Sequence, residues 1–100
     1  MGLPPYDKQA LAGLCRRHGI RRLSLFGSVL KGTDRPDSDI DLLVEFEPDA
    51  IPSYFGLAEI ETKLTALLSG KRVDLRTAGE LSRYFREDVV RAAEPLYEAA

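Results

Sequence analysis

Hydrophobic residues follow two kinds of pattern along the chain. Those at helical spacing lie in residues 6–15, 57–68 and 81–93, and those in strand-like runs lie near 22–26, 40–46 and 71–76. This arrangement predicts an α/β (α+β) domain with a small mixed β-sheet, packed by helices largely on one face. The second run is apolar at nearly every position after Asp41, which is typical of a central strand buried on both faces.

The polar segments between these elements carry turn and loop signals. Residues 33–38 are polar and include a proline, so they predict a loop in which Asp34 and Asp37 are simply solvated. Near the C-terminal end, Pro95 would break helical hydrogen bonding, and residues 95–97 are therefore expected to form a short edge strand. The apolar residues that the preceding helix is expected to bury are Leu81, Phe85, Val89 and Ala93.

Composition narrows the class of protein. One hundred residues, 44% of them hydrophobic and 30% charged, predict one domain over residues 1–100 with a modest core. A net charge of −2 gives no basic footprint for direct non-specific nucleic-acid binding. A single cysteine allows no internal disulfide, and no signal peptide or membrane-length apolar run is visible. We therefore expect a cytoplasmic protein without membrane contact. Because its core is small, the chain could also form a homo-oligomer.

The candidate chemistry lies at the ends of the first two predicted strands. The first strand ends at Gly27-Ser28, where the glycine lets a backbone approach closely and Ser28 offers a hydroxyl and an amide. Asp39 and Asp41 open the second strand, and because side chains alternate along a strand they point to the same face. Adjacent carboxylates repel unless a proton or a cation intervenes. Phosphate on one side and a divalent cation on the other is the layout of a nucleotide-handling site.

This two-part pattern resembles the signature of the nucleotidyltransferase superfamily, which includes DNA polymerase beta. The chain length and the sequence of residues 38–44 are most similar to the minimal nucleotidyltransferase (MNT) proteins of prokaryotes. Members of that family are antitoxins encoded beside a HEPN-domain protein. The resemblance covers roughly residues 21–97, and its diagnostic part is residues 27–41. It implies the nucleotidyltransferase fold.

The resemblance also implies a site. Asp39 and Asp41 would bind two Mg²⁺ ions, with Mn²⁺ as a substitute, since oxygen ligands suit these hard cations. Asp74 on the third predicted strand would complete the metal site, and all three aspartates would be catalytic. Gly27 and Ser28 would hold the β- and γ-phosphates of a nucleoside triphosphate, expected to be ATP.

Asp74 has a second interpretation. Residues 71–76 alternate strictly between apolar and charged positions, so Asp74 shares one strand face with Arg72 and Arg76. It could therefore be a surface carboxylate that is paired with these arginines and has no catalytic role.

Three functions follow from different classes of protein. The resemblance favours an enzyme that transfers AMP from ATP to a hydroxyl of a partner HEPN-domain protein, as its antitoxin. The alternatives are a binding module that neutralises the partner by occlusion alone and a nucleotidyltransferase that modifies a small molecule. The last is less favoured because such enzymes carry an additional substrate domain. The enzyme is preferred over occlusion because Gly27-Ser28 and the three aspartates are all present.

Overall fold

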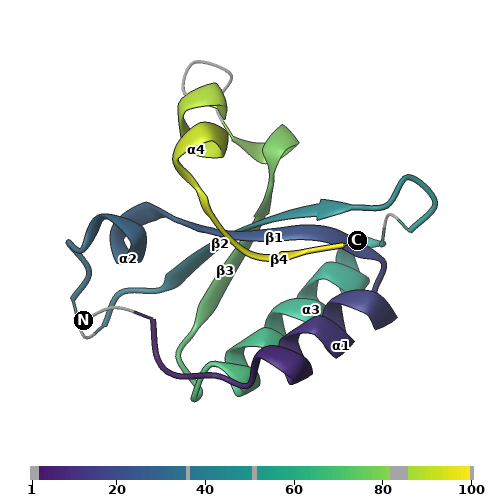
Figure 1. Ribbon diagram of the computed structural model, residues 1–100, viewed down its shortest axis with the longest axis horizontal. Coiled ribbons are helices and arrows are strands. Elements are labelled where there is room, and N and C mark those ends of the chain that lie inside the picture. The colour runs from purple at the N-terminus through teal and green to yellow at the C-terminus, as the bar shows by residue number, and fades with distance from the viewer. Residues whose placement is uncertain (1–2, 36, 51, 82–85, 100) are drawn as a thin grey trace.

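The computed structural model describes residues 3–35, 37–50, 52–81 and 86–99. In chain order its elements are α1 (Lys8–Arg17), β1 (Ile20–Phe26), α2 (Gly27–Lys31), β2 (Ile40–Phe46), α3 (Tyr54–Leu67), β3 (Val73–Thr77), a short 3₁₀ helix (Ala78–Glu80), α4 (Arg86–Ala92) and β4 (Glu94–Glu98) (Figure 1). The predicted α/β class is confirmed, and so are the strands predicted near 22–26, 40–46 and 71–76. Helix α1 begins later than the N-terminal prolines suggest, because the Asp7 side chain caps it by accepting hydrogen bonds from the amides of Gln9 and Ala10.

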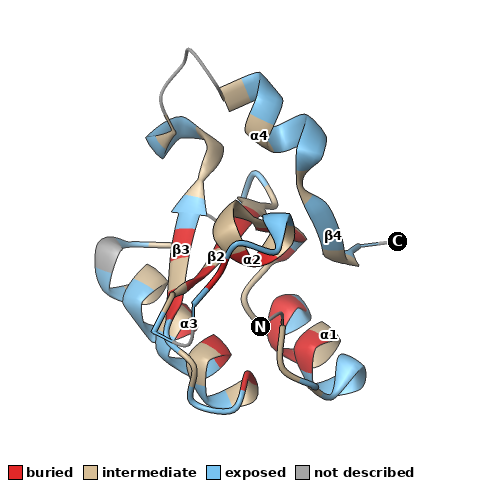
Figure 2. Cartoon of the chain, turned by 90° about the vertical axis from the view of Figure 1, so that its left-hand side faces the viewer, coloured by how far each residue is buried: buried red, intermediate tan, exposed pale blue. Residues whose placement is uncertain are grey.

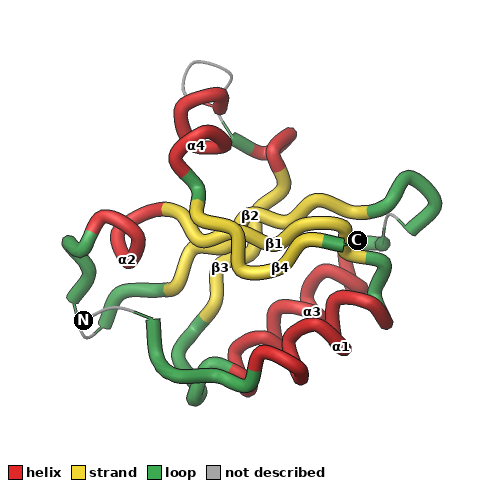
Figure 3. The backbone as a smooth tube through the Cα atoms, in the orientation of Figure 1, coloured by secondary structure: helices red, strands yellow, loops and turns green. Residues whose placement is uncertain are grey.

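The four strands form one mixed sheet in the order β3-β2-β1-β4 (Figure 3). Strand β1 is antiparallel to β2 and β4, whereas β2 and β3 run parallel and are joined by α3. Because β2 lies inside the sheet, it has a neighbour on each side, as its apolar sequence predicts. The short strand predicted at the C-terminal end is confirmed as the edge strand β4, where Pro95 lacks an amide hydrogen.

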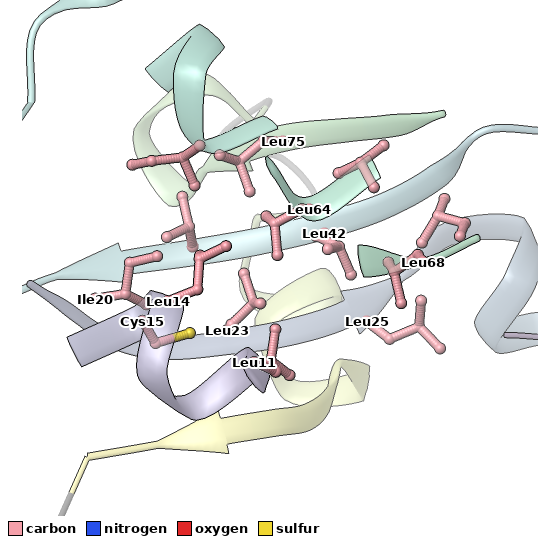
Figure 4. Packing of buried hydrophobic residues seen from close by; sticks show 14 of the residues in the cluster. Leu11, Leu14, Cys15, Ile20, Leu23, Leu25, Leu42, Leu64, Leu68 and Leu75 are labelled. Atoms are coloured by element: carbon pink, nitrogen blue, oxygen red, sulfur yellow. The ribbon is translucent and has the colours of Figure 1, made fainter. Parts of the chain in front are cut away.

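Helices α1 and α3 cover one face of the sheet, and the core lies between them and the strands (Figures 1 and 4). Residues on the inward face of each strand alternate with residues on the opposite face, so each strand contributes every second side chain to this core. The fully enclosed apolar side chains include Cys15, Ile20, Leu23, Ile40, Leu42, Ile60, Leu64, Leu68 and Val73. The cysteine is a free thiol inside this core, where burial raises its pKa to about 11.

The free edge of β3 is closed by side chains rather than by another strand. Every second amide of an edge strand points away from the sheet and needs a partner. Side-chain oxygens of α3 and of the 3₁₀ helix accept these hydrogen bonds: Thr65 from Val73, Glu61 from Leu75 and Glu80 from Thr77, at 3.0–3.1 Å. These contacts fix β3, the strand that carries Asp74, against the rest of the fold.

The prediction for the last helix is wrong in part. Residues 82–85 lie outside the described residues, and Phe85, which was expected to be buried, is one of them. The helix that is described spans Arg86–Ala92. None of these seven residues is buried, and Leu81, Val89 and Ala93 are half-buried rather than in the core (Figure 2). Helix α4 stands away from α1 and α3 on the other side of the sheet, so its apolar residues have little protein to pack against (Figure 1). Across the described ranges, no helix has the length and apolar character needed to cross a membrane.

Candidate active site

Asp41 and Asp74 lie side by side on neighbouring strands. They are direct partners in the parallel pairing of β2 with β3, so their side chains leave the same face of the sheet. This is the face opposite the core, because Leu42 and Leu75, the next residues along each strand, are buried in the core. Asp39 directly precedes β2 at the same end of the sheet.

The charges of these carboxylates act on one another. Burial, followed by the negative charges of Asp74 and Asp39, raises the pKa of Asp41 above its usual value. Arg76 and a hydrogen bond from the Ser28 amide act in the opposite direction. Asp41 is therefore the central carboxylate of the group, and it is only partly compensated by its surroundings.

The turn at Gly27 is built around Asp41. Phe26, the last residue of β1, pairs with Asp41 across the sheet, and Gly27 follows with a φ of 78° that disfavours other residues. A Cβ built on Gly27 would lie 2.9 Å from Cγ of Asp41 and closer still to its Oδ2. The Ser28 amide donates to the Asp41 side chain. Gly27 and Ser28 thus contact this carboxylate directly.

The other two carboxylates each face an arginine. Nε and Nη2 of Arg76 contact Oδ1 and Oδ2 of Asp74 at 3.1 and 3.3 Å, in a two-pronged ion pair. Nε of Arg72 lies 4.0 Å from Oδ2 of Asp39, a much looser contact. Both interpretations of Asp74 therefore have support, since it is adjacent to Asp41 and paired with an arginine. In this arrangement, no three Asp, Glu, His or Cys side chains of the described residues are grouped to hold a metal ion.

Asp34 was missed as a structural residue, and the expectation that it is solvated is wrong. Its side chain is 0% exposed, and Oδ2 lies 3.8 Å from Nζ of Lys71, which is itself mostly buried. The loop turns back toward the segment before β3, where the amide of Ile40 also donates to the carbonyl of Arg72 at 2.8 Å. Asp34 thereby ties the loop that leads to Asp39 to the segment that enters β3, the strand that carries Asp74. Asp37 is exposed, as expected.

A pocket of about 470 Å³ opens beside this site, between α2 and α4. Its walls include Phe26, Gly27 and Leu30 on one side and Val89 and Ala92 on the other. The pocket shares Gly27 with the carboxylate site, so the turn that holds Asp41 also forms part of its wall. Sequence patterns gave no sign of this pocket, because it depends on where α4 stands relative to α2.

Comparison with known proteins identifies the family of this chain. The family model described as a nucleotidyltransferase domain matches residues 7–95. This chain belongs to the nucleotidyltransferase domain family. It is 42% identical over 78 residues to the protein adenylyltransferase MntA of Thermococcus cleftensis, a match that covers 78% of this chain and 76% of that protein.

Solved structures of similar proteins have the same fold. One, assigned to a minimal nucleotidyltransferase, is 42% identical, with a TM-score of 0.72 over 88% of this chain and 87% of its own. A second, a toxin–antitoxin crystal structure with AMP-PNP, is 25% identical, with a TM-score of 0.71 over 93% of this chain and 74% of its own. The expected resemblance to MntA-type minimal nucleotidyltransferases is thus confirmed, and the protein is a nucleotidyltransferase.

We expect Gly27→Ala to be much more damaging than Gly32→Ala. Both glycines have a left-handed φ, of 78° and 74°, so each alanine meets a similar backbone cost of roughly 1–2 kcal/mol. Only at Gly27 would the new methyl overlap Asp41, whereas nothing lies within 4 Å of a Cβ at Gly32. The overlap should cost about 1–3 kcal/mol more, which thermal unfolding of the two variants would measure. Equal melting temperatures would show that Gly27 does not support Asp41.

We expect Asp41→Asn to stabilise the metal-free protein at neutral pH. Because folding raises the pKa of Asp41, the folded state binds more protons than the unfolded state above the usual value of 3.8. The ionised side chain therefore lowers the free energy of unfolding as the pH rises from that value through the folded-state pKa. Asparagine removes this loss, so the gain in melting temperature over wild type should shrink as the pH falls toward 3.8.

The matched control for this pH series is Asp37→Asn, which removes the same charge from an exposed loop position. Its melting temperature should follow that of wild type across the series. A loss of stability in Asp41→Asn at neutral pH would contradict the repulsion inferred at this site.

Proposed function

We propose that the protein is a metal-dependent adenylyltransferase that transfers AMP from ATP to a hydroxyl group of a partner HEPN-domain protein and acts as its antitoxin. The observation that carries this proposal is the adjacent pair Asp41 and Asp74, placed beside the Gly27-Ser28 turn. Phosphoryl transfer depends on positioning and on charge neutralisation more than on covalent chemistry by the protein. An adjacent pair of carboxylates, next to a turn that borders a small pocket, suits that task.

The donor set fits Mg²⁺ or Mn²⁺. All three candidate ligands are carboxylates. The pKa of Asp41 is raised by burial and then by its two acidic neighbours, and a cation relieves the repulsion between them. We infer that Asp39 and Asp41 would hold both metal ions and that Asp74 would hold the one on the side of the attacking hydroxyl. Two such ions, when bound, neutralise the charge on the transferred phosphoryl group and on the leaving pyrophosphate.

The residues of the chain have separate tasks in this reaction. Asp74 is placed to help the acceptor hydroxyl lose its proton, because it is the carboxylate farthest from the Gly27-Ser28 turn in the strand order. Gly27 and Ser28 would position the β- and γ-phosphates so that pyrophosphate leaves in line with the attack. The Ser28 amide already donates to Asp41, which leaves its hydroxyl as the group for phosphate contact.

The substrate and partner rest on the similar proteins. One similar structure is a toxin–antitoxin assembly with AMP-PNP, and the similar protein of Thermococcus cleftensis is a protein adenylyltransferase. These relatives favour ATP over other nucleoside triphosphates and a protein over a small molecule as acceptor. Occlusion without catalysis is the competing function, and the arginine on Asp74 is the observation in its favour.

Labelling of the partner tests this proposal. The protein is incubated with the HEPN-domain protein of the same genome, Mg²⁺ and ATP radiolabelled at the α-phosphate. We expect wild type and the exposed-loop variant Asp37→Asn to label the partner, and Asp39→Asn to lose labelling because a charged ligand is gone. Suppression of the partner by wild type without any transfer of label would establish occlusion in place of catalysis.

A further inference from the structure

Arg76 makes a closer contact with the site than any other cation in the described part of the chain. Its guanidinium places two nitrogens on the two oxygens of Asp74, at 3.1 and 3.3 Å. Paired donors of this kind match the geometry of a carboxylate, so the contact is more directional than an ordinary surface ion pair. Arg72, at 4.0 Å from Asp39, uses a single nitrogen and is far more exposed, at 83% against 47% for Arg76.

This ion pair uses the atoms that a metal would need. A carboxylate ligates a cation through its oxygen lone pairs, and both oxygens of Asp74 are directed at Arg76. Arg76 also lies close enough to Asp41 to oppose the rise in its pKa. One guanidinium therefore compensates two carboxylates of the candidate site, and the described residues hold no ready-made group of metal ligands.

We propose that Arg76 is an internal competitor of the divalent cation for Asp74, so that Asp74 becomes a metal ligand only after this ion pair opens. The inference rests on the proposed function, because it concerns the same metal site. Arg76 is a positioning residue in this account, since it acts through Asp74. Its consequence is an order of assembly: Asp39 and Asp41 are available to metal and nucleotide first, and Asp74 joins later.

The competition explains how the site tolerates its own charge. Without a counter-ion, adjacent carboxylates repel, and the repulsion is largest where they are partly buried. Arg76 supplies that counter-ion in the metal-free protein. The same contact must weaken metal binding, because the free energy of the ion pair is lost when the cation arrives. An ion pair that shared no oxygen with the metal would change metal affinity only through the charge of Arg76, and Arg76→Lys keeps that charge while losing the paired donors.

Binding of Mn²⁺ in the absence of nucleotide tests the proposal. We expect Arg76→Gln to bind Mn²⁺ more tightly than wild type, on the order of fivefold, as followed by electron paramagnetic resonance of free Mn²⁺. The same variant should have a lower melting temperature without metal and a larger gain on adding Mn²⁺. Arg76→Lys, which keeps the charge but lacks the paired donors, should give an intermediate affinity.

The matched control is Arg21→Gln. Arg21 is an exposed arginine that pairs with Glu45 at 3.5 Å and lies at the opposite end of β1, so its loss removes the same charge far from the site. Equal or weaker Mn²⁺ binding by Arg76→Gln, or an equal increase in Arg21→Gln, would overturn the competitor role.

A further variant, Asp41→Asn, distinguishes a wrong competitor role for Arg76 from a wrong proposed function. If Asp41→Asn abolishes Mn²⁺ binding but substitutions of Arg76 change nothing, the metal site stands and only the competition is wrong. If wild type shows no Mn²⁺ binding that depends on Asp41, with or without AMP-PNP, then the metal-dependent function is wrong and the competitor role falls with it.

Discussion

The packing of the Asp41 carboxylate against the backbone of Gly27 is the contact on which the site depends. Any side chain at Gly27 would overlap Asp41, and the next amide, from Ser28, donates to the same carboxylate. The turn between β1 and α2 is thereby fixed relative to the start of β2. The pairing of β2 with β3 then places Asp74 beside Asp41 without any further adjustment. Three segments that are distant in sequence meet at one end of the sheet through these two constraints.

One face of the sheet carries the core that stabilises the fold, and the other carries the candidate site. The face toward α1 and α3 buries the apolar core, whereas the opposite face carries like charges that oppose folding. Side-chain caps along the free edge of β3 and the buried ion pair of Asp34 with Lys71 hold the charged strands in place. Helix α4, with no buried residue, adds little to this framework but forms one wall of the pocket beside the site.

Much of this arrangement could be predicted from local sequence patterns. Apolar runs located the strands, because buried strands need apolar side chains at the period of a strand. The spacing from Gly27-Ser28 to Asp41 identified residues that lie in contact in the structure. Asp34 could not be recognised, because a polar residue in a polar loop gives no sign of a buried partner 37 positions away. Arg76 was visible on the correct strand face, but only side-chain geometry shows that both its nitrogens engage Asp74. The last helix was overestimated because its apolar spacing says nothing about whether a neighbour exists to bury it.

The most direct test of the account is the position of Mn²⁺ in a crystal of this protein grown with AMP-PNP, read from the anomalous scattering of the metal. We expect manganese between Asp39 and Asp41, with Asp74 within ligand distance of one ion, its contact with Arg76 broken, and the phosphates beside Gly27 and Ser28. Nucleotide bound elsewhere, or manganese that leaves Asp41 without a metal contact, would contradict it.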